Sequence, residues 1–140
     1  MPLVRISVFD SMAADKRRKL PQAVYDAMRQ AISIPEGDLF VVLTPHADGE
    51  LVADPSFMGV HRSSDFTLVN ITLRRGRSTE LKQGLYREIV KLAEERAGIS
   101  PENVMVVLSE NDLADWSFGK GEAQYVLNPP PPPPASGAGR

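Results

Sequence analysis

The chain has 140 residues, a formal net charge of −2 at pH 7 and no cysteine. This length predicts one domain with a modest core, and the charge gives no basic surface for nucleic acid or for an acidic membrane. The lack of cysteine excludes disulfides, thiolate chemistry and cysteine-based metal sites. No apolar run reaches the roughly 18 residues of a membrane span. No secretory signal is visible, so we expect a soluble, cytoplasmic protein.

The first half of the chain predicts a strand, a helix and a second strand. Residues 3–8 form a short β-branched run directly after Pro2. Helix-favouring sequence covers residues 13–32, although Pro21 inside it predicts either a kink or a helix that begins there. Leu39–Thr44 is apolar on both faces, as expected for a strand that is parallel to its neighbour and connected through a helix.

The second half predicts the same order of elements. Residues 67–74 form a strand-like run, and residues 79–97 carry apolar side chains at helical spacing. Ser78 is a suitable N-cap for this helix, and Gly98 is a suitable stop. Val104–Ser109 is the closing strand.

Matching residues recur at a shift of 65 positions. Leu3–Val8 matches Leu68–Leu73, and Val41–Leu43 matches Val106–Leu108. The chain therefore contains two copies of one β-α-β unit. Two such units predict an α+β fold, in which a four-stranded mixed sheet carries both helices on one face. The other face would stay bare in a monomer, so we expect a homo-oligomer.

Three segments lie outside the repeated elements. Residues 45–65 join the halves and predict a loop that could include a short hairpin. Residues 110–127 contain three aromatic residues, which we expect to cover a pocket or a partner. Residues 129–140 begin with six consecutive prolines and predict a disordered polyproline tail. The expected organisation is a domain of residues 1–128, with units at about 2–66 and 67–128, followed by this tail.

Pro2 would carry a free secondary amine at the start of a strand if Met1 were removed. Such an amine acts as a base when neutral, and as an acid or an iminium-forming group towards a carbonyl compound. Arg74–Arg77 (Arg-Arg-Gly-Arg) precedes the second helix, where guanidinium groups suit a carboxylate or a phosphate. A solvated basic turn is the alternative interpretation.

Asp38 follows a Pro-Glu-Gly turn at the start of the second strand. Carboxylates there are usually turn formers, so Asp38 matters for function only if Pro2 lies close by. His46 and His61 both fall in the joining loop, without a second ligand or a nucleophile at a telling spacing. We expect them to be surface or hydrogen-bonding residues, and we predict no metal site.

Pro2, the duplicated unit and Arg75-Gly76-Arg77 together resemble the tautomerase superfamily. Within it, the chain is most similar to the malonate semialdehyde decarboxylase branch. The most specific stretch is Asp115–Gly121 (Asp-Trp-Ser-Phe-Gly-Lys-Gly). The similarity covers about residues 2–126. The other stretches that carry it are Met1–Leu3, Pro35–Asp38 and Gly98–Pro101.

This resemblance implies a homotrimer that decarboxylates a small 3-oxo acid, such as malonate semialdehyde, to an aldehyde and carbon dioxide. Such an enzyme is a carbon–carbon lyase that needs no cofactor, and it could also show tautomerase or hydratase activity. Pro2 would be the catalytic residue, with Asp38 close to its nitrogen. The implied binding residues for a small carboxylate substrate are Arg75, Arg77, Trp116 and Phe118.

The chain departs from the pattern of this branch in two ways. Gly76 stands where the decarboxylases carry proline, and Arg74 adds a third guanidinium, which leaves open the pair that binds the carboxylate. Asp115 keeps a second chemistry open, in which a carboxylate activates water as in 3-haloacrylate dehalogenases. Two other functions also remain. One is keto–enol tautomerisation of a 2-oxo acid by neutral Pro2, and the other is a non-catalytic trimer that presents its proline tails.

Overall fold

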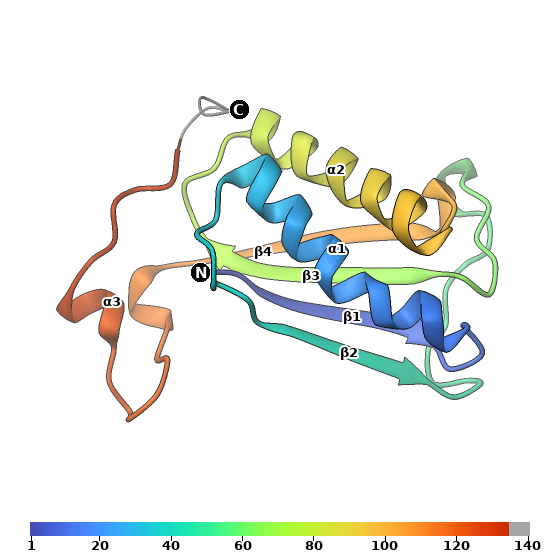
Figure 1. Cartoon of the computed structure of the whole chain (residues 1–140), viewed down its shortest axis with the longest axis horizontal. Helices are drawn as coiled ribbons and strands as arrows, with labels where there is room; N and C mark the ends of the chain where they lie inside the picture. Colours follow the sequence, from blue (N-terminus) through green and yellow to red (C-terminus); the bar gives the residue numbers. More distant parts are fainter. Residues whose placement is uncertain (135–140) are drawn as a thin grey trace.

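The computed structural model describes residues 1–134. Two long helices cross one face of a single sheet (Figure 1). The main elements are β1 (Leu3–Phe9), α1 (Ala14–Ile32), β2 (Val41–His46), β3 (Thr67–Arg74), α2 (Thr79–Ala97) and β4 (Val104–Asn111). Short helical turns occupy Phe57–Gly59, Pro101–Asn103, Leu113–Asp115 and α3 (Gln124–Leu127).

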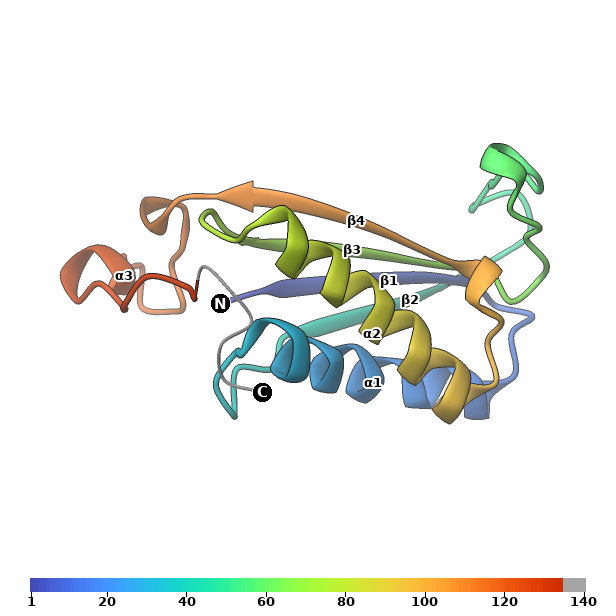
Figure 2. The same ribbon diagram turned by 90° about the horizontal axis from the view of Figure 1, so that it is seen from above.

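The sheet has four strands in the order β2-β1-β3-β4. β1 and β2 are parallel, β3 and β4 are parallel, and the central pair of β1 and β3 is antiparallel. Seen from above, α1 and α2 lie on the same side of this sheet (Figure 2). The predicted α+β fold, a mixed four-stranded sheet with two helices on one face, is therefore confirmed.

The internal repeat is visible in the helices. Shifting the bounds of α1 by 65 residues gives the bounds of α2, and both helices have 19 residues. α2 begins and ends at the predicted signals: the Ser78 hydroxyl accepts a hydrogen bond from the amide of Leu81 at 3.2 Å, and Gly98 takes the left-handed conformation with φ 65°. α1 runs through Pro21, so it does not begin there. The cost of the missing amide is offset because the flanking Leu20 and Val24 are buried.

The largest differences from the predicted bounds are in β2 and in β4, which ends at Asn111 instead of Ser109. β2 begins at Val41, two residues later than expected, and it extends to His46. No hairpin forms within residues 47–65, where the structure has only the turn Phe57–Gly59. The Arg62 guanidinium donates hydrogen bonds to the carbonyls of Asp54, Phe57 and Val60, so this side chain replaces part of the pairing that a hairpin would supply.

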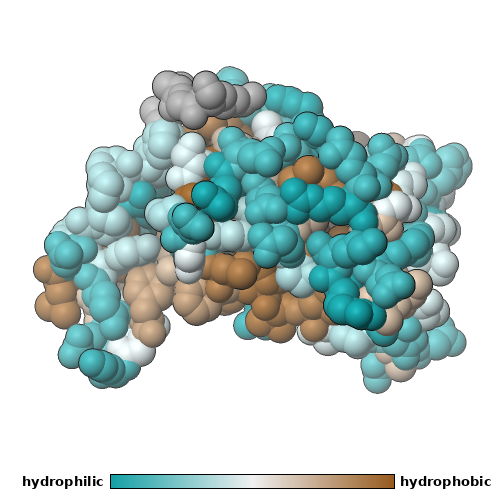
Figure 3. All heavy atoms as spheres, viewed as in Figure 1, coloured by the Kyte–Doolittle hydropathy of each residue, from teal (hydrophilic) through white to brown (hydrophobic). Residues whose placement is uncertain are grey.

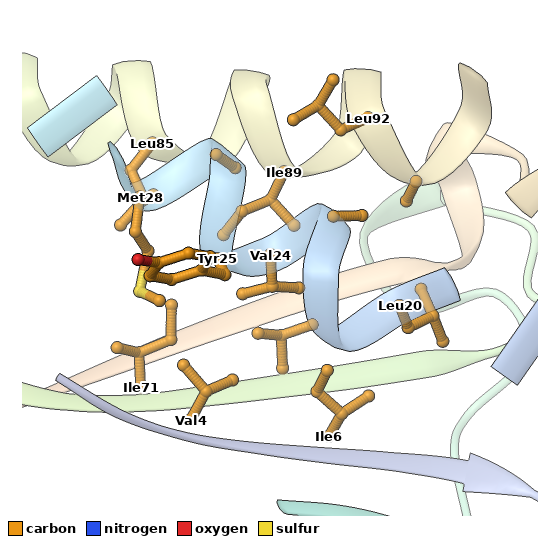
Figure 4. Close-up of a cluster of buried hydrophobic side chains, with 14 of the residues drawn as sticks. Val4, Ile6, Leu20, Val24, Tyr25, Met28, Ile71, Leu85, Ile89 and Leu92 are labelled. Atoms are coloured by element: carbon orange, nitrogen blue, oxygen red, sulfur yellow. The ribbon is translucent and has the colours of Figure 1, made fainter. Parts of the chain in front are cut away.

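The core lies between the sheet and the two helices (Figure 4). Strand residues Val4, Ile6 and Ile71 point towards Val24 of α1 and Ile89 of α2, and all five are at most 1% exposed. Each such side chain contributes roughly 1.5–3 kcal/mol when it is fully buried. This packing fixes the sheet and therefore the positions of the strand ends.

The opposite face of the sheet carries apolar side chains in contact with solvent. Val42, Met105 and Val107 are 42%, 42% and 38% exposed. Apolar side chains also gather along the lower part of the surface shown in Figure 3. In the described part of the chain, no helix combines the length and the apolar character that crossing a bilayer requires.

The first part of the proline tail lies against the turn after β3. Pro130, Pro132 and Pro133 line a groove together with Arg75 and Asp112. The predicted disorder of residues 135–140 concerns a stretch that lies outside the described residues.

Candidate active site

The antiparallel pairing of β1 and β3 places the start of the chain beside the end of β3. Leu3 is paired with Thr72. Continuing this register sets Pro2 level with Leu73 and Met1 level with Arg74. Both ribbon views show the amino terminus at this end of the sheet (Figures 1 and 2). The strand order thus brings Pro2 close to the arginine-rich turn.

The outer strands complete this end of the sheet. The amide of Val4 donates to the carbonyl of Phe40 at 3.0 Å, which holds the segment before β2 against the start of β1. That segment contains Asp38. On the other side, Arg74 is paired with Asn111 at the end of β4. The beginnings of two strands and the ends of two others therefore meet around the first residues of the chain.

Asp38 lies beside the terminal amine. Its carboxylate Oδ2 is 3.9 Å from the nitrogen of Met1, and the residue is only 8% exposed. The preceding turn is held by the Gly37 amide, which donates to the Tyr25 hydroxyl at 2.8 Å. Burial raises the pKa of Asp38 above its ordinary value, while the amine and Arg77 act in the opposite direction. Asp38 is therefore close to Met1, the residue directly before Pro2.

The terminal amine is less basic than an ordinary one. Burial is the largest cause that lowers the pKa of the Met1 amine, and the charges of Arg74 and Arg77 lower it further. Asp38 partly offsets these effects. Pro2 itself is buried. An amine at this position is therefore close to one negative side chain, Asp38, and to two positive ones, Arg74 and Arg77.

The three arginines of the turn are placed differently. Arg74 and Arg77 are half-buried, and Arg77 Nη1 donates to the carbonyl of Arg74 at 3.2 Å. Burial, followed by the charge of Arg74, lowers the pKa of Arg77. Arg75 is 62% exposed, and its Nε lies 3.3 Å from Asp112 Oδ1. Of the two arginines in the predicted pair, the structure brings Arg77 towards the amine and turns Arg75 outwards.

A cavity of about 420 Å³ opens at the amino terminus, within the usual range for sites that bind small molecules. Trp116 and Phe118 form one side of it, with ring centroids 5.7 Å apart and planes inclined by 19°. Trp116 Nε1 donates to Asn111 Oδ1 at 2.8 Å, which fixes the indole. Met1 and Pro2 also line the cavity, whereas Asp38, Arg74 and Arg77, whose charges act on the amine of Met1, are not among the lining residues.

Tyr125 is one of the three aromatic residues of 110–127 that we expect to cover a pocket or a partner. Its ring meets Phe118 edge-on at 4.8 Å. Burial raises the pKa of the Tyr125 hydroxyl, and the charges of Asp38, Arg74 and Arg77 all act on it. Its place in the last aromatic cluster of the sequence was the one available signal.

Other candidate residues are occupied elsewhere. The Asp115 carboxylate accepts the amide of Asp112 at 2.8 Å and so caps a helical turn, although the residue also lines the cavity. His46 ends β2 at the far edge of the sheet, and His61 is exposed in the loop. Among residues 1–134, no group of three or more carboxylate or imidazole side chains is arranged to hold a metal ion.

A family model described as "tautomerase enzyme" matches residues 38–119. The chain belongs to the tautomerase family. Two proteins of Bacillus subtilis strain 168, both named as probable tautomerases, are similar along almost their whole length. YusQ is 32% identical and YrdN 29% identical over 126 residues, which is 90% of this chain and 99% and 97% of the relatives.

Solved structures place the chain in the branch expected from the sequence. It superposes on a malonate semialdehyde decarboxylase, described with decarboxylase and hydratase activities, with a TM-score of 0.82 and 33% identity over 89% of this chain and 96% of that one. The FG41 malonate semialdehyde decarboxylase inhibited by 3-bromopropiolate gives 0.83 and 32% over 89% and 95%. The resemblance to the malonate semialdehyde decarboxylase branch of the tautomerase family is confirmed.

Proposed function

We propose that this tautomerase-family protein decarboxylates a small 3-oxo acid of the malonate semialdehyde type, with the amine of Pro2 as the catalytic group once Met1 is removed. The observation that carries this proposal is the surroundings of the first amine. A buried carboxylate, Asp38, lies 3.9 Å from it, and guanidinium charges act on it beside an aromatic cavity. Similarity to two malonate semialdehyde decarboxylases supports the class of substrate.

The reaction breaks the bond between the substrate's carboxylate and its α-carbon. The electron pair of this bond moves towards the carbonyl carbon, so the group at the carbonyl must accept negative charge. Protonated Pro2 does this by donating a hydrogen bond to the carbonyl oxygen, and an iminium formed with loss of water does it by accepting the pair at nitrogen. A proton then returns to the α-carbon. With protonated Pro2 this leaves an aldehyde and carbon dioxide, and on the iminium route a water molecule must also hydrolyse the product iminium to release the aldehyde and the free amine of Pro2.

The remaining residues position the substrate. Arg77 and a second guanidinium of the same turn would hold the carboxylate out of the carbonyl plane, and the motif gives the second place to Arg75. Trp116 and Phe118 would form an apolar wall that favours neutral carbon dioxide over a hydrated anion. Asp38, as an anion, would favour the protonated form of Pro2 by charge pairing.

We also propose that the protein is a homotrimer. The exposed apolar side chains of Val42, Met105 and Val107 on the uncovered sheet face support burial against other copies. A fused 4-OT structure that shares the fold at 22% identity is described as a symmetric trimer.

A keto–enol tautomerase is the second candidate function. Burial and the nearby guanidinium groups lower the pKa of the terminal amine, and a neutral amine is the form that abstracts a proton from a 2-oxo acid. The two Bacillus subtilis relatives are named as probable tautomerases. The pH profile separates the two functions, because decarboxylation through a protonated amine declines as the amine loses its proton, whereas tautomerisation increases.

The proposal is tested on the intact amino terminus. Mass spectrometry should show a chain that begins at Pro2, and borohydride reduction with malonate semialdehyde should trap an adduct on that residue if an iminium forms. Pro2→Ala should abolish turnover, whereas Pro101→Ala, a proline of the turn before β4, should retain it. A retained Met1 would contradict every catalytic role of Pro2, because its nitrogen would then be an amide.

A further inference from the structure

We infer that Arg74, and not Arg75 of the motif, is the second guanidinium that binds the substrate carboxylate together with Arg77. This inference rests on the proposed function and assigns its binding residues. Three observations carry it: the face of β3 on which Arg74 lies, the buried and unpaired nitrogens of Arg74 and Arg77, and the separate contacts of Arg75.

The alternation of side chains along β3 directs Arg74 to the cavity side of the sheet. Val69, Ile71 and Leu73 are buried in the core between sheet and helices. The residues between them therefore belong to the other face. Thr72 is one of these and lines the cavity. Arg74, the last residue of β3, is the next residue on that face, one position closer to the terminal amine.

Arg74 and Arg77 carry hydrogen-bond donors that have no acceptor. The Nε atoms of both side chains are buried, and neither has a partner within residues 1–134. A buried donor without a partner is unfavourable by about 1–3 kcal/mol. The two side chains are also near enough for the charge of Arg74 to lower the pKa of Arg77. A carboxylate placed between them would supply acceptors and relieve this repulsion.

Arg75 has different contacts. Its guanidinium is 62% exposed and paired with Asp112, whereas the half-buried Arg74 forms no ion pair within residues 1–134, although both arginines line the groove that contains Pro130, Pro132 and Pro133. Arg74 acts on the charge of the Met1 amine and on Tyr125, whereas Arg75 is not among the residues that do so. The contacts of Arg75 therefore stabilise the outside of the turn.

Gly76 explains why the arginine used here is not the one that the motif indicates. Its φ of 129° is open to glycine but closed to proline, whose ring fixes φ near −65°. A proline at this position could not follow the same backbone path. The turn of this chain thus turns Arg75 outwards, and the arginine added at position 74 takes its place.

The test measures carboxylate binding in the full-length protein with Met1 removed. The probe is 3-hydroxypropanoate, which keeps the carboxylate but lacks the reactive aldehyde. Trp116 is the only tryptophan of the chain and lines the cavity, so its fluorescence reports binding. Arg74→Ala and Arg77→Ala should each raise the dissociation constant by about 10- to 100-fold, the range expected for a lost charged hydrogen bond. Arg75→Ala should change it by less than about threefold.

A second set of variants guards against loss of folding. Arg74→Gln keeps a polar, hydrogen-bonding side chain without the charge and should weaken binding as Arg74→Ala does, while Arg74→Lys should recover part of the affinity. If Arg75→Ala weakens binding as much as Arg74→Ala, or if Arg74→Gln binds normally, the inference is overturned although the proposed function stands. If the wild-type protein does not bind 3-hydroxypropanoate at all, the proposed function fails, and the inference with it.

Discussion

Replacing Asp38 with asparagine should lower the pKa of the catalytic amine. Asp38 Oδ2 lies 3.9 Å from the nitrogen of Met1, the residue before Pro2, and two unit charges at that distance interact with about 4 kcal/mol at an effective dielectric constant near 20. This energy corresponds to about three pKa units. Because Arg77 also faces Asp38 and competes for its charge, we expect the pKa of the Pro2 amine to fall by about 1–3 units in Asp38→Asn.

The assay is the pH dependence of kcat/KM, measured beside an NMR titration of isotope-labelled Pro2. A decarboxylase that needs the protonated amine loses activity as pH rises, and this descending limb should move to lower pH in Asp38→Asn. A tautomerase that needs the neutral amine gains activity as pH rises, and that ascending limb should likewise move to lower pH. The same variant therefore reports both the charge pairing and the protonation state that catalysis requires.

Asp112→Asn is the matched control, because Asp112 is a carboxylate at the same end of the sheet, 69% exposed and paired with Arg75. This control should leave the titration of Pro2 unchanged. An amine pKa that stays constant or rises in Asp38→Asn would refute the electrostatic role assigned to Asp38.

Three further predictions concern stability and assembly. Burial raises the folded-state pKa of Asp38 above 3.8, so the ionised carboxylate destabilises the fold. Asp38→Asn should therefore melt at a higher temperature than the wild type at neutral pH. The two melting temperatures should converge as pH falls below 3.8. Val107→Asp should give monomers in light scattering after size exclusion, whereas Lys91→Asp on α2 should leave the oligomer intact, and an unchanged mass for Val107→Asp would argue against the sheet-face interface. Gly76→Ala should lower the free energy of unfolding, measured in urea, by about 1–3 kcal/mol because of backbone strain. The loss should be larger in the full chain than in a chain ending at residue 128, because the new Cβ would lie 2.9 Å from Cγ of Pro133. Equal losses in the two chains would show that the tail does not pack there.

The order and type of the main elements could be read from the sequence because their signals are local. Ser78 and Gly98 mark the ends of α2, and the 65-residue shift then locates α1 despite Pro21. The predicted start of β2 was two residues too early because Leu39 and Phe40 are apolar, like the strand residues that follow them. Phe40 is apolar for another reason, since it lines the cavity, and both residues remain exposed.

The site depended on information that the sequence does not carry locally. That Asp38 lies near the start of the chain follows from the order β2-β1-β3, and the sequence pattern does not decide this order because either arrangement of the two units fits it. The distinction between Arg74 and Arg75 depends on the backbone path through Gly76, which a spacing rule cannot supply. Tyr125 reaches the site only through the folded segment after β4.

The duplication gives this chain two equivalent first strands, β1 and β3, but only β1 begins at the amino terminus. The shift of 65 residues relates Pro2 to Thr67, whose nitrogen lies in mid-chain as an unreactive amide. It relates Asp38 to Asn103, which is also buried, but whose side chain binds Ser63 through two hydrogen bonds of 2.8 and 3.0 Å. A chain in which the two units are joined therefore has one terminal amine, whereas two separate units would have two. In the second unit, the neutral side chain of Asn103 therefore holds the connecting loop in place, whereas the corresponding residue of the first unit, Asp38, carries a carboxylate.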